Sequence, residues 1–144
     1  MRAPIMALAI SCLAGAASAQ GSTTVSGPDV VAVGPAREVP SGAKKQAEDA
    51  IRRDLANPDG AMFRAVRANQ VASMRHDAFS AEIDGPITLV CGQFTSGDAK
   101  GGDSDYAWFL AAIKRGHVLW TTLDDASGGP AAAHDTCKAA GLAK

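Results

Sequence analysis

The sequence lacks an excess of charge of either sign. Fourteen Lys and Arg residues stand against fifteen Asp and Glu residues among 144, so the formal net charge is -1 at pH 7. Proteins that bind nucleic acid through its phosphates usually carry a basic stripe, and this chain has neither such a stripe nor a polyacidic tail. We therefore expect no nucleic-acid partner, and the length is that of one ordinary domain.

The sequence also has no apolar run of the ~20 residues needed to cross a membrane. Its first apolar run covers residues 5–17, after Arg2, and ends on the small-x-small triplet at 17–19. A basic start, a short apolar segment and such a triplet are together typical of a secretion signal. We predict a signal peptide over residues 1–19 with cleavage after Ala19, a periplasmic or secreted product, and no transmembrane segment in the mature chain.

Cysteine is scarce, with three residues in the chain. Cys12 lies in the predicted signal peptide, and the residues before it match a lipoprotein signal too poorly for us to expect a lipid anchor there. Cleavage leaves Cys91 and Cys137, an even number in an oxidising compartment, which favours one disulfide between them. The alternative is a free nucleophilic thiol at Cys137, assisted by His134 on the same helical face.

Motifs for common catalytic chemistry are missing. The chain contains no G-x-S-x-G elbow, no G-x-x-x-x-G-K-[ST] phosphate loop, no H-E-x-x-H and no C-x-x-C. Its three histidines, His76, His117 and His134, fall on different predicted elements. We therefore predict no catalytic residue, no metal site and no cofactor, while an active site assembled from distant residues stays open.

Composition divides the mature chain into a lead segment and a folded part. Residues 20–40 mix Gly, Ser, Thr, Pro and Val without a helical or strand period, so we interpret them as a flexible linker. A single domain over residues 41–144 follows. It begins with a predicted helix over about 42–56, where apolar residues recur at three- and four-residue spacing and Ser41 is the expected N-cap.

Four or five strands are expected after this helix. Period-two alternation or β-branched runs predict strands within 61–68, 79–83, 87–91, 106–113 and 117–123. The segment 106–113 is apolar on both faces. Two turns are expected between strands, one at Asp84-Gly85-Pro86 and one at the two-residue hairpin Arg115-Gly116.

A short helix over residues 131–140 is predicted to end the domain, because Pro130 suits a first helical position and Gly141 a position just past the end. It carries Cys137, so a bridge to Cys91 would tie it to the sheet. Together the elements predict an α+β fold: an N-terminal helix, a four- to five-stranded antiparallel meander and a short C-terminal helix tied by a disulfide. We expect both helices on one face of the sheet.

The polar loop at 95–105 has the composition of a binding loop. Its acidic residues Asp98, Asp103 and Asp105 offer oxygen ligands for calcium, but their spacing does not fit the EF-hand loop and Lys100 adds a cation. We therefore predict no metal there. A plain solvated connection is the alternative to a functional loop.

Aromatic residues follow this loop on neighbouring predicted strands. Tyr106 and Trp108 share one side of their strand and Phe109 points to the other, while Trp120 lies on the next strand. If one sheet face is open, one of these sets is exposed and can stack on a sugar or a peptide. The predicted binding loop comprises Asp98, Asp103, Asp105, Tyr106 and Trp108.

One residue pattern extends over most of the predicted domain. It reads L-x-x-P-x-x-A-x-F from Leu55, V-C-G from Val90 and G-G-x-x-x-Y-x-x-F from Gly101, and it ends on Cys137. The pattern resembles a group of small uncharacterised exported proteobacterial proteins over about residues 44–140. The resemblance implies export, paired cysteines and the same fold, but no reaction, and the chain departs from the group's pattern within the polar loop.

Three functions are compatible with these observations. The first is an exported module without enzymatic activity that binds an envelope or extracellular partner through the polar loop and the adjacent aromatics. The second is a small envelope hydrolase that uses acidic loop residues with Tyr106 and His117. The third is a purely structural envelope protein. We favour the binding module, because the sequence contains none of the catalytic motifs tested.

Overall fold

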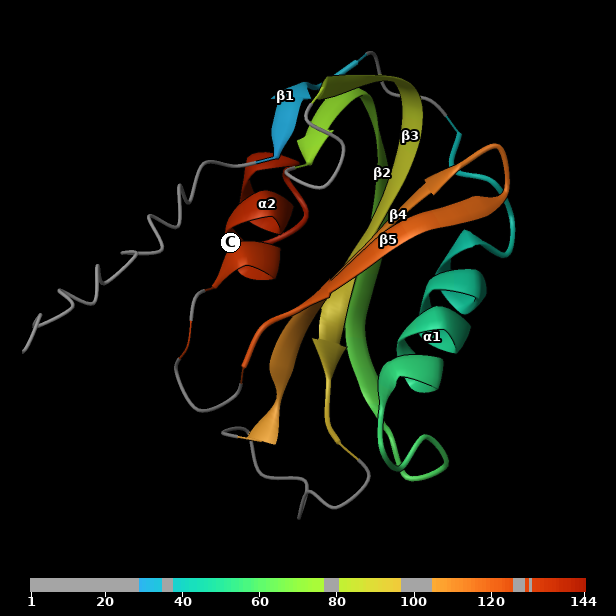
Figure 1. The fold of residues 1–144 in the computed structure, drawn as a ribbon, viewed down its shortest axis with the longest axis vertical. Helices are drawn as coiled ribbons and strands as arrows, with labels where there is room; N and C mark the ends of the chain where they lie inside the picture. The colour runs from blue at the N-terminus through green and yellow to red at the C-terminus, as the bar shows by residue number, and fades with distance from the viewer. Residues whose placement is uncertain (1–28, 35–37, 77–80, 97–104, 126–128, 130) are drawn as a thin grey trace, which may run out of the picture.

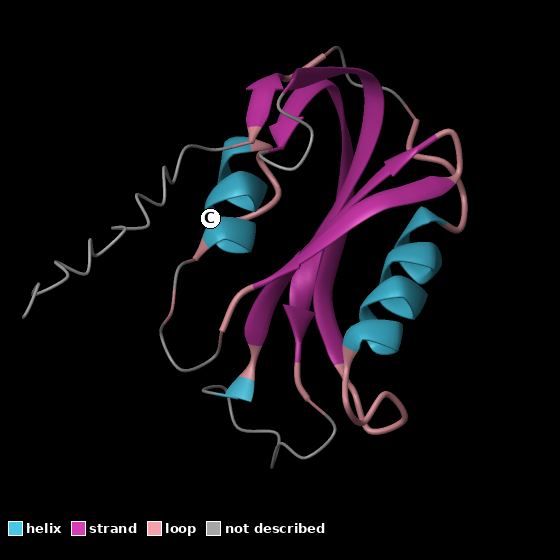
Figure 2. Cartoon of the chain, viewed as in Figure 1, coloured by secondary structure: helices cyan, strands magenta, loops and turns pink. Residues whose placement is uncertain are grey.

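The chain folds into five strands and two helices, which is an α+β fold (Figure 1, Figure 2). The computed structural model describes residues 29–34, 38–76, 81–96, 105–125, 129 and 131–144, so the predicted signal peptide lies outside the described residues. In chain order the elements are β1 (Val30–Ala32), α1 (Ala43–Asp54), β2 (Phe63–His76), β3 (Ala81–Phe94), β4 (Ala107–Lys114), β5 (His117–Leu123) and α2 (Ala132–Ala139).

The strands form one antiparallel meander in the order β1-β2-β3-β4-β5, so each strand pairs with its neighbour in sequence. The antiparallel sheet agrees with the predicted fold class. The helix is not the N-terminal element, however, because β1 precedes α1. Residues 30–32, within the segment interpreted as a linker, form β1, and Val30 lies opposite Met74 at the end of β2. Three residues are too few to reveal a strand period in the sequence.

The two helices lie on opposite faces of the sheet, which corrects the expectation that they share one (Figure 1). The core under α1 contains Phe109 and Ala111 of β4, whereas the core under α2 contains Leu110 and Ala112 of the same strand. Successive residues of a strand point to opposite faces, so β4 contributes to both cores. This confirms that the segment is apolar on both sides, and all four residues are fully buried.

Residues 84–86 do not form the predicted turn but lie inside β3. A register shift in the pairing of β2 with β3 places Gly85 and Pro86 opposite the single residue Ala72, which makes a β-bulge. Proline is tolerated there because β4 pairs with β3 only from Thr88 onward, so this part of β3 is an edge. The Gly-Pro pair therefore marks a bulge in one long strand.

The hairpin between β4 and β5 is the predicted one. Arg115 and Gly116 connect the strands and both have positive φ angles, 51° and 77°. Two central residues of this kind make the turn whose twist matches the flanking strands.

The predicted disulfide joins β3 to α2. Cys91 and Cys137 are bonded, with their Cα atoms 5.9 Å apart, and both side chains are fully buried. Because a bridged sulfur cannot attack a substrate, the alternative of a free thiol at Cys137 is wrong.

The end of α2 follows the glycine signal in the sequence. Gly141 has a φ of 74° and its N–H donates to the Lys138 carbonyl at 3.0 Å. The Leu142 N–H donates to the Cys137 carbonyl at 2.8 Å, and the Leu142 side chain is buried. These two bonds and the buried residue after the glycine make a Schellman motif, which satisfies carbonyls at the end of the helix.

The start of α2 is capped from the end of β5. Asp124 Oδ1 accepts a hydrogen bond from the Ala133 N–H at 2.8 Å, and Oδ2 accepts one from the His134 N–H at 2.9 Å. One carboxylate therefore satisfies two of the backbone donors that a helix start leaves unpaired. The cap comes from nine residues upstream, beyond the range in which sequence patterns of capping are read.

We expect Asp124→Ala to lower the free energy of unfolding by about 2 kcal/mol, because both N–H groups lose their acceptor. Urea unfolding followed by circular dichroism measures this loss. Asp135→Ala is the control: Asp135 lies in the first turn of α2, with its exposed carboxylate beside the His134 ring. Equal losses for the two variants would show that the capping bonds contribute little.

Candidate functional site

The structure describes three of the five predicted binding-loop residues: Asp105, Tyr106 and Trp108. Asp98 and Asp103 lie outside the described residues. The Arg64 guanidinium carbon lies 3.6 Å from the centre of the Tyr106 ring, which is a cation–π contact. All three described loop residues are partly buried, so other residues of the protein cover part of each side chain.

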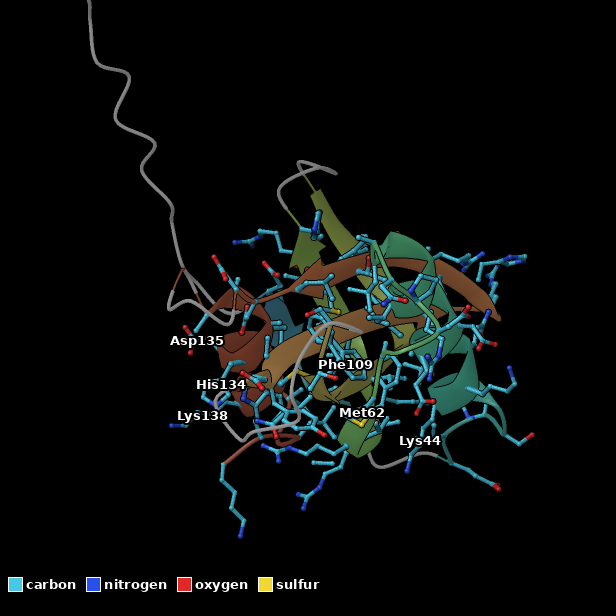
Figure 3. The ribbon with its side chains drawn as sticks, turned by 90° about the horizontal axis from the view of Figure 1, so that it is seen from below. Lys44, Met62, Phe109, His134, Asp135 and Lys138 are labelled. Atoms are coloured by element: carbon cyan, nitrogen blue, oxygen red, sulfur yellow. A yellow bond between two sulfur atoms is a disulfide. The ribbon has the colours of Figure 1, made fainter. Side chains whose placement is uncertain are left out.

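Trp108 packs against α2. Its ring centre lies 5.0 Å from that of His134, and its side chain is partly buried against the core under α2. Figure 3 shows His134, Asp135 and Lys138 together on α2, on the far side of Phe109 from Lys44 of α1. Trp108 is thus largely a packing residue, and Phe109 is fully buried on the other face.

A small open cavity of about 240 Å³ lies beside these aromatics. It is lined by Tyr106, Ala107, Trp108, Asp124, Asp125, Gly129, Ala131 and His134. Both carboxylate oxygens of Asp124 are bonded to α2, so this acid is occupied as a cap. We call Tyr106, Trp108 and His134 the aromatic patch.

The hydrolase hypothesis combined Tyr106 with His117, and the fold separates these residues. Tyr106 precedes the first residue of β4, whereas His117 pairs with Lys114, the last. At ~3.3 Å per residue, the strand of 8 residues holds them about 25 Å apart. They cannot act on one bond of a small substrate.

The histidines do not converge on a metal site. The His76 ring packs on Trp120 with ring centres 4.5 Å apart, and His134 packs on Trp108. Among the residues that the structure describes, no three His, Cys, Asp or Glu side chains gather closely enough to hold a metal ion.

A larger cleft lies at the opposite end of the sheet, and we call it the hairpin cleft. It measures about 560 Å³, within the ~300–1,000 Å³ typical of small-molecule sites. Four chain segments form its walls: the start of α1, the bulge of β3, the facing part of β2, and the hairpin between β4 and β5. Its lining residues are Pro40, Ser41, Ala43, Gln46, Gln70, Asp84, Gly85, Pro86, Thr88, Ile113, Lys114, Arg115 and Gly116.

One residue of the cleft wall, Gln70, has a buried polar atom without a hydrogen-bond partner among the described residues. Its Nε2 donates to the Glu38 carbonyl at 3.3 Å, which fixes the orientation of the amide, because a flipped amide would bring two oxygens together. Its Oε1 is then a buried acceptor, and it has no hydrogen-bond partner among the described residues. Leaving such a group unpaired costs about 1–3 kcal/mol.

Two sides of the hairpin cleft are electrically positive: the hairpin supplies cationic side chains, and α1 supplies the positive end of its helix dipole. Lys114 and Arg115 come from the hairpin, and the Lys114 ammonium donates to the Asp84 carbonyl. Gly42, not the expected Ser41, is the N-cap of α1. This helix start has no side-chain cap and no acidic residue in its first turn, so its positive dipole end is not neutralised there.

Sequence reasoning missed the hairpin cleft because its polar residues come from four separate segments. Gln46, Gln70, Thr88 and Lys114 share no motif or spacing. Only the pair Gly85-Pro86 carried a signal, and it was interpreted as a turn. The bulge that these residues form is part of the wall of the cleft.

Comparison with known proteins assigns no function to the site. No protein family, curated protein or solved structure matches the chain. Within the described ranges, no helix is long and apolar enough to cross a membrane.

Proposed function

We propose that this chain is an exported module that binds a free amino acid or a short peptide in the hairpin cleft. The observation that carries this proposal is Gln70, which lines an open polar cleft and whose buried Oε1 has no hydrogen-bond partner among the described residues. Native proteins rarely leave such a group without a partner, and a ligand is one reason to retain it. A rotation of the Gln70 side chain that gives up the hydrogen bond to the exposed Glu38 carbonyl would bring Oε1 to a donor of that ligand.

The ligand class follows from the charges around the hairpin cleft. Gln70 Oε1 and the Asp84 carboxylate require hydrogen-bond donors, which an ammonium or a peptide N–H supplies. Lys114, Arg115 and the start of α1 favour a carboxylate. A zwitterion with both groups, such as an amino acid or a dipeptide, matches the two sides at once.

Export is part of the proposal. The start of the sequence has the three parts of a secretion signal, and the buried disulfide is of a kind that persists in oxidising compartments. Membership of the group of small exported proteobacterial proteins belongs to the same proposal. We propose periplasm or medium as the location, with cleavage after Ala19.

Gln70→Leu tests the role of the unpaired amide. We expect the variant to be at least as stable as the wild type, by up to about 2 kcal/mol, because removing the buried unpaired oxygen outweighs the loss of the exposed hydrogen bond to the Glu38 carbonyl. We expect its affinity for the ligand to fall at least about tenfold, because a hydrogen bond is lost. Urea unfolding measures the first effect. Calorimetric titration with a pool of free amino acids, and then with glycylglycine, measures the second.

Gln93→Leu is the matched control. Gln93 also lies on the sheet, but its Oε1 accepts from the Arg64 Nε at 2.8 Å, outside the hairpin cleft. This variant should bind the probes as the wild type does. A Gln70→Leu protein that loses stability and keeps its affinity would show that the amide serves the fold and not a ligand.

A further inference from the structure

Strand β5 forms one edge of the sheet. On the opposite side β1, with 3 residues, pairs only with the end of β2, whereas β5 has 7 residues and pairs with β4 alone. Figure 1 looks onto β5, which lies in front of the other strands and is crossed by no described element in this view. Proteins often keep their edge strands short, which prevents pairing with strands of other chains. β5 is not short and lacks this protection.

The sequence of β5 also lacks the usual edge protection. Residues 118–123 read VLWTTL, with no charged residue and no proline. Natural edge strands commonly carry a lysine, a proline or an inward-pointing charge that blocks further pairing. An uncharged, β-branched and aromatic edge is instead suited to pairing with another strand.

Backbone groups of β5 point outward at alternating positions. The Asp124 N–H donates to the Trp108 carbonyl at 2.9 Å, toward β4. Because the direction alternates along an antiparallel strand, the N–H and C=O of Leu123 and Thr121 point away from β4. The Thr121 hydroxyl donates to Asp54 of α1 at 2.9 Å, so its side chain turns away from the edge and does not cover these groups.

Charge at the two ends of β5 identifies the partner. Arg115 lies just before its start, whereas Asp125 follows its end. In an antiparallel pair of two β5 strands, the basic start of each lies beside the acidic end of the other. We propose that β5 pairs with β5 of a second copy, giving a two-fold dimer with a continuous sheet.

This inference does not depend on a ligand in the hairpin cleft. Sedimentation velocity of the purified protein over a range of concentrations should show a monomer–dimer equilibrium. Thr121→Pro should abolish the dimer, because proline removes an outward N–H that β4 does not use. Circular dichroism checks that this variant folds, and Leu119→Lys, which places a charge on the edge strand, is the second variant if it does not.

A charge exchange tests the direction of pairing. Arg115→Asp keeps a residue suited to the positive φ of the turn, and Asp125→Arg reverses the other end. Each single variant should weaken the dimer about tenfold, because the change acts twice across the two-fold axis. The double variant should recover most of the loss. A protein that stays monomeric at every concentration, or a dimer that survives both edge variants, would overturn the proposal.

Discussion

Replacing both Cys91 and Cys137 by Ala is expected to lower the melting temperature by roughly 15–30 °C. The disulfide joins residues 46 positions apart, and such a cross-link reduces the entropy of the unfolded chain by an amount worth about 4 kcal/mol. Typical domains are stable by only ~5–15 kcal/mol. α2 has 8 residues and would be marginal as an isolated helix, so it depends strongly on this bond.

Reduction of the wild-type protein provides the matched comparison. Dithiothreitol should shift the melting curve of the wild type toward that of the double variant, and it should leave the double variant unchanged. A double variant that melts within a few degrees of the oxidised wild type would mean that packing alone holds α2 on the sheet.

Gly85→Ala is expected to destabilise the protein by at least about 3 kcal/mol. A Cβ atom at this position would lie 2.3 Å from the Ala72 carbonyl oxygen and 2.6 Å from the Val71 carbonyl oxygen. These atoms belong to the backbone of β2, so they cannot move aside without breaking the pairing of the two strands. Urea unfolding of the purified variant measures the loss.

Glu82→Ala is the control for Gly85→Ala, since Glu82 is exposed on the same strand. Its effect should stay within about 0.5 kcal/mol, as for most surface substitutions. An equally mild effect of Gly85→Ala would contradict the close approach of β2 and β3 at the bulge. It would also contradict the wall of the hairpin cleft that the bulge forms.

The sequence predicted best the features that local chemistry decides. Arg115-Gly116 makes the predicted hairpin, since a two-residue turn depends only on its own φ angles. Gly141 ends α2 for the same kind of reason. The pairing of Cys91 with Cys137 needed only an even count and an oxidising compartment.

Features that depend on distant residues were not predictable. Gly85-Pro86 is read as a turn by composition, and only the facing residue Ala72 reveals a bulge. The apolar segment of β4 showed that both of its faces are buried, but not which helix covers which face. The Asp124 cap and the walls of the hairpin cleft likewise join segments that no local pattern connects.

The candidate site in the structure is therefore a different one from the predicted loop. Trp108 packs beside His134 against the core under α2, and the Arg64 guanidinium lies over the Tyr106 ring. Gln70 and Lys114 line a larger cleft at the other end of the sheet. Residues in a loop attract attention in a sequence, whereas a cleft between strands exists only after the sheet has formed.

Amide chemical-shift mapping tests the proposed function most directly. The ¹⁵N-labelled protein would be titrated with the amino-acid pool and then with glycylglycine. We expect shifts at Gln70, Thr88 and Lys114 in the hairpin cleft, and their loss in Gln70→Leu. Shifts confined to Tyr106 and Trp108 at the aromatic patch, or no shift at any residue, would contradict it.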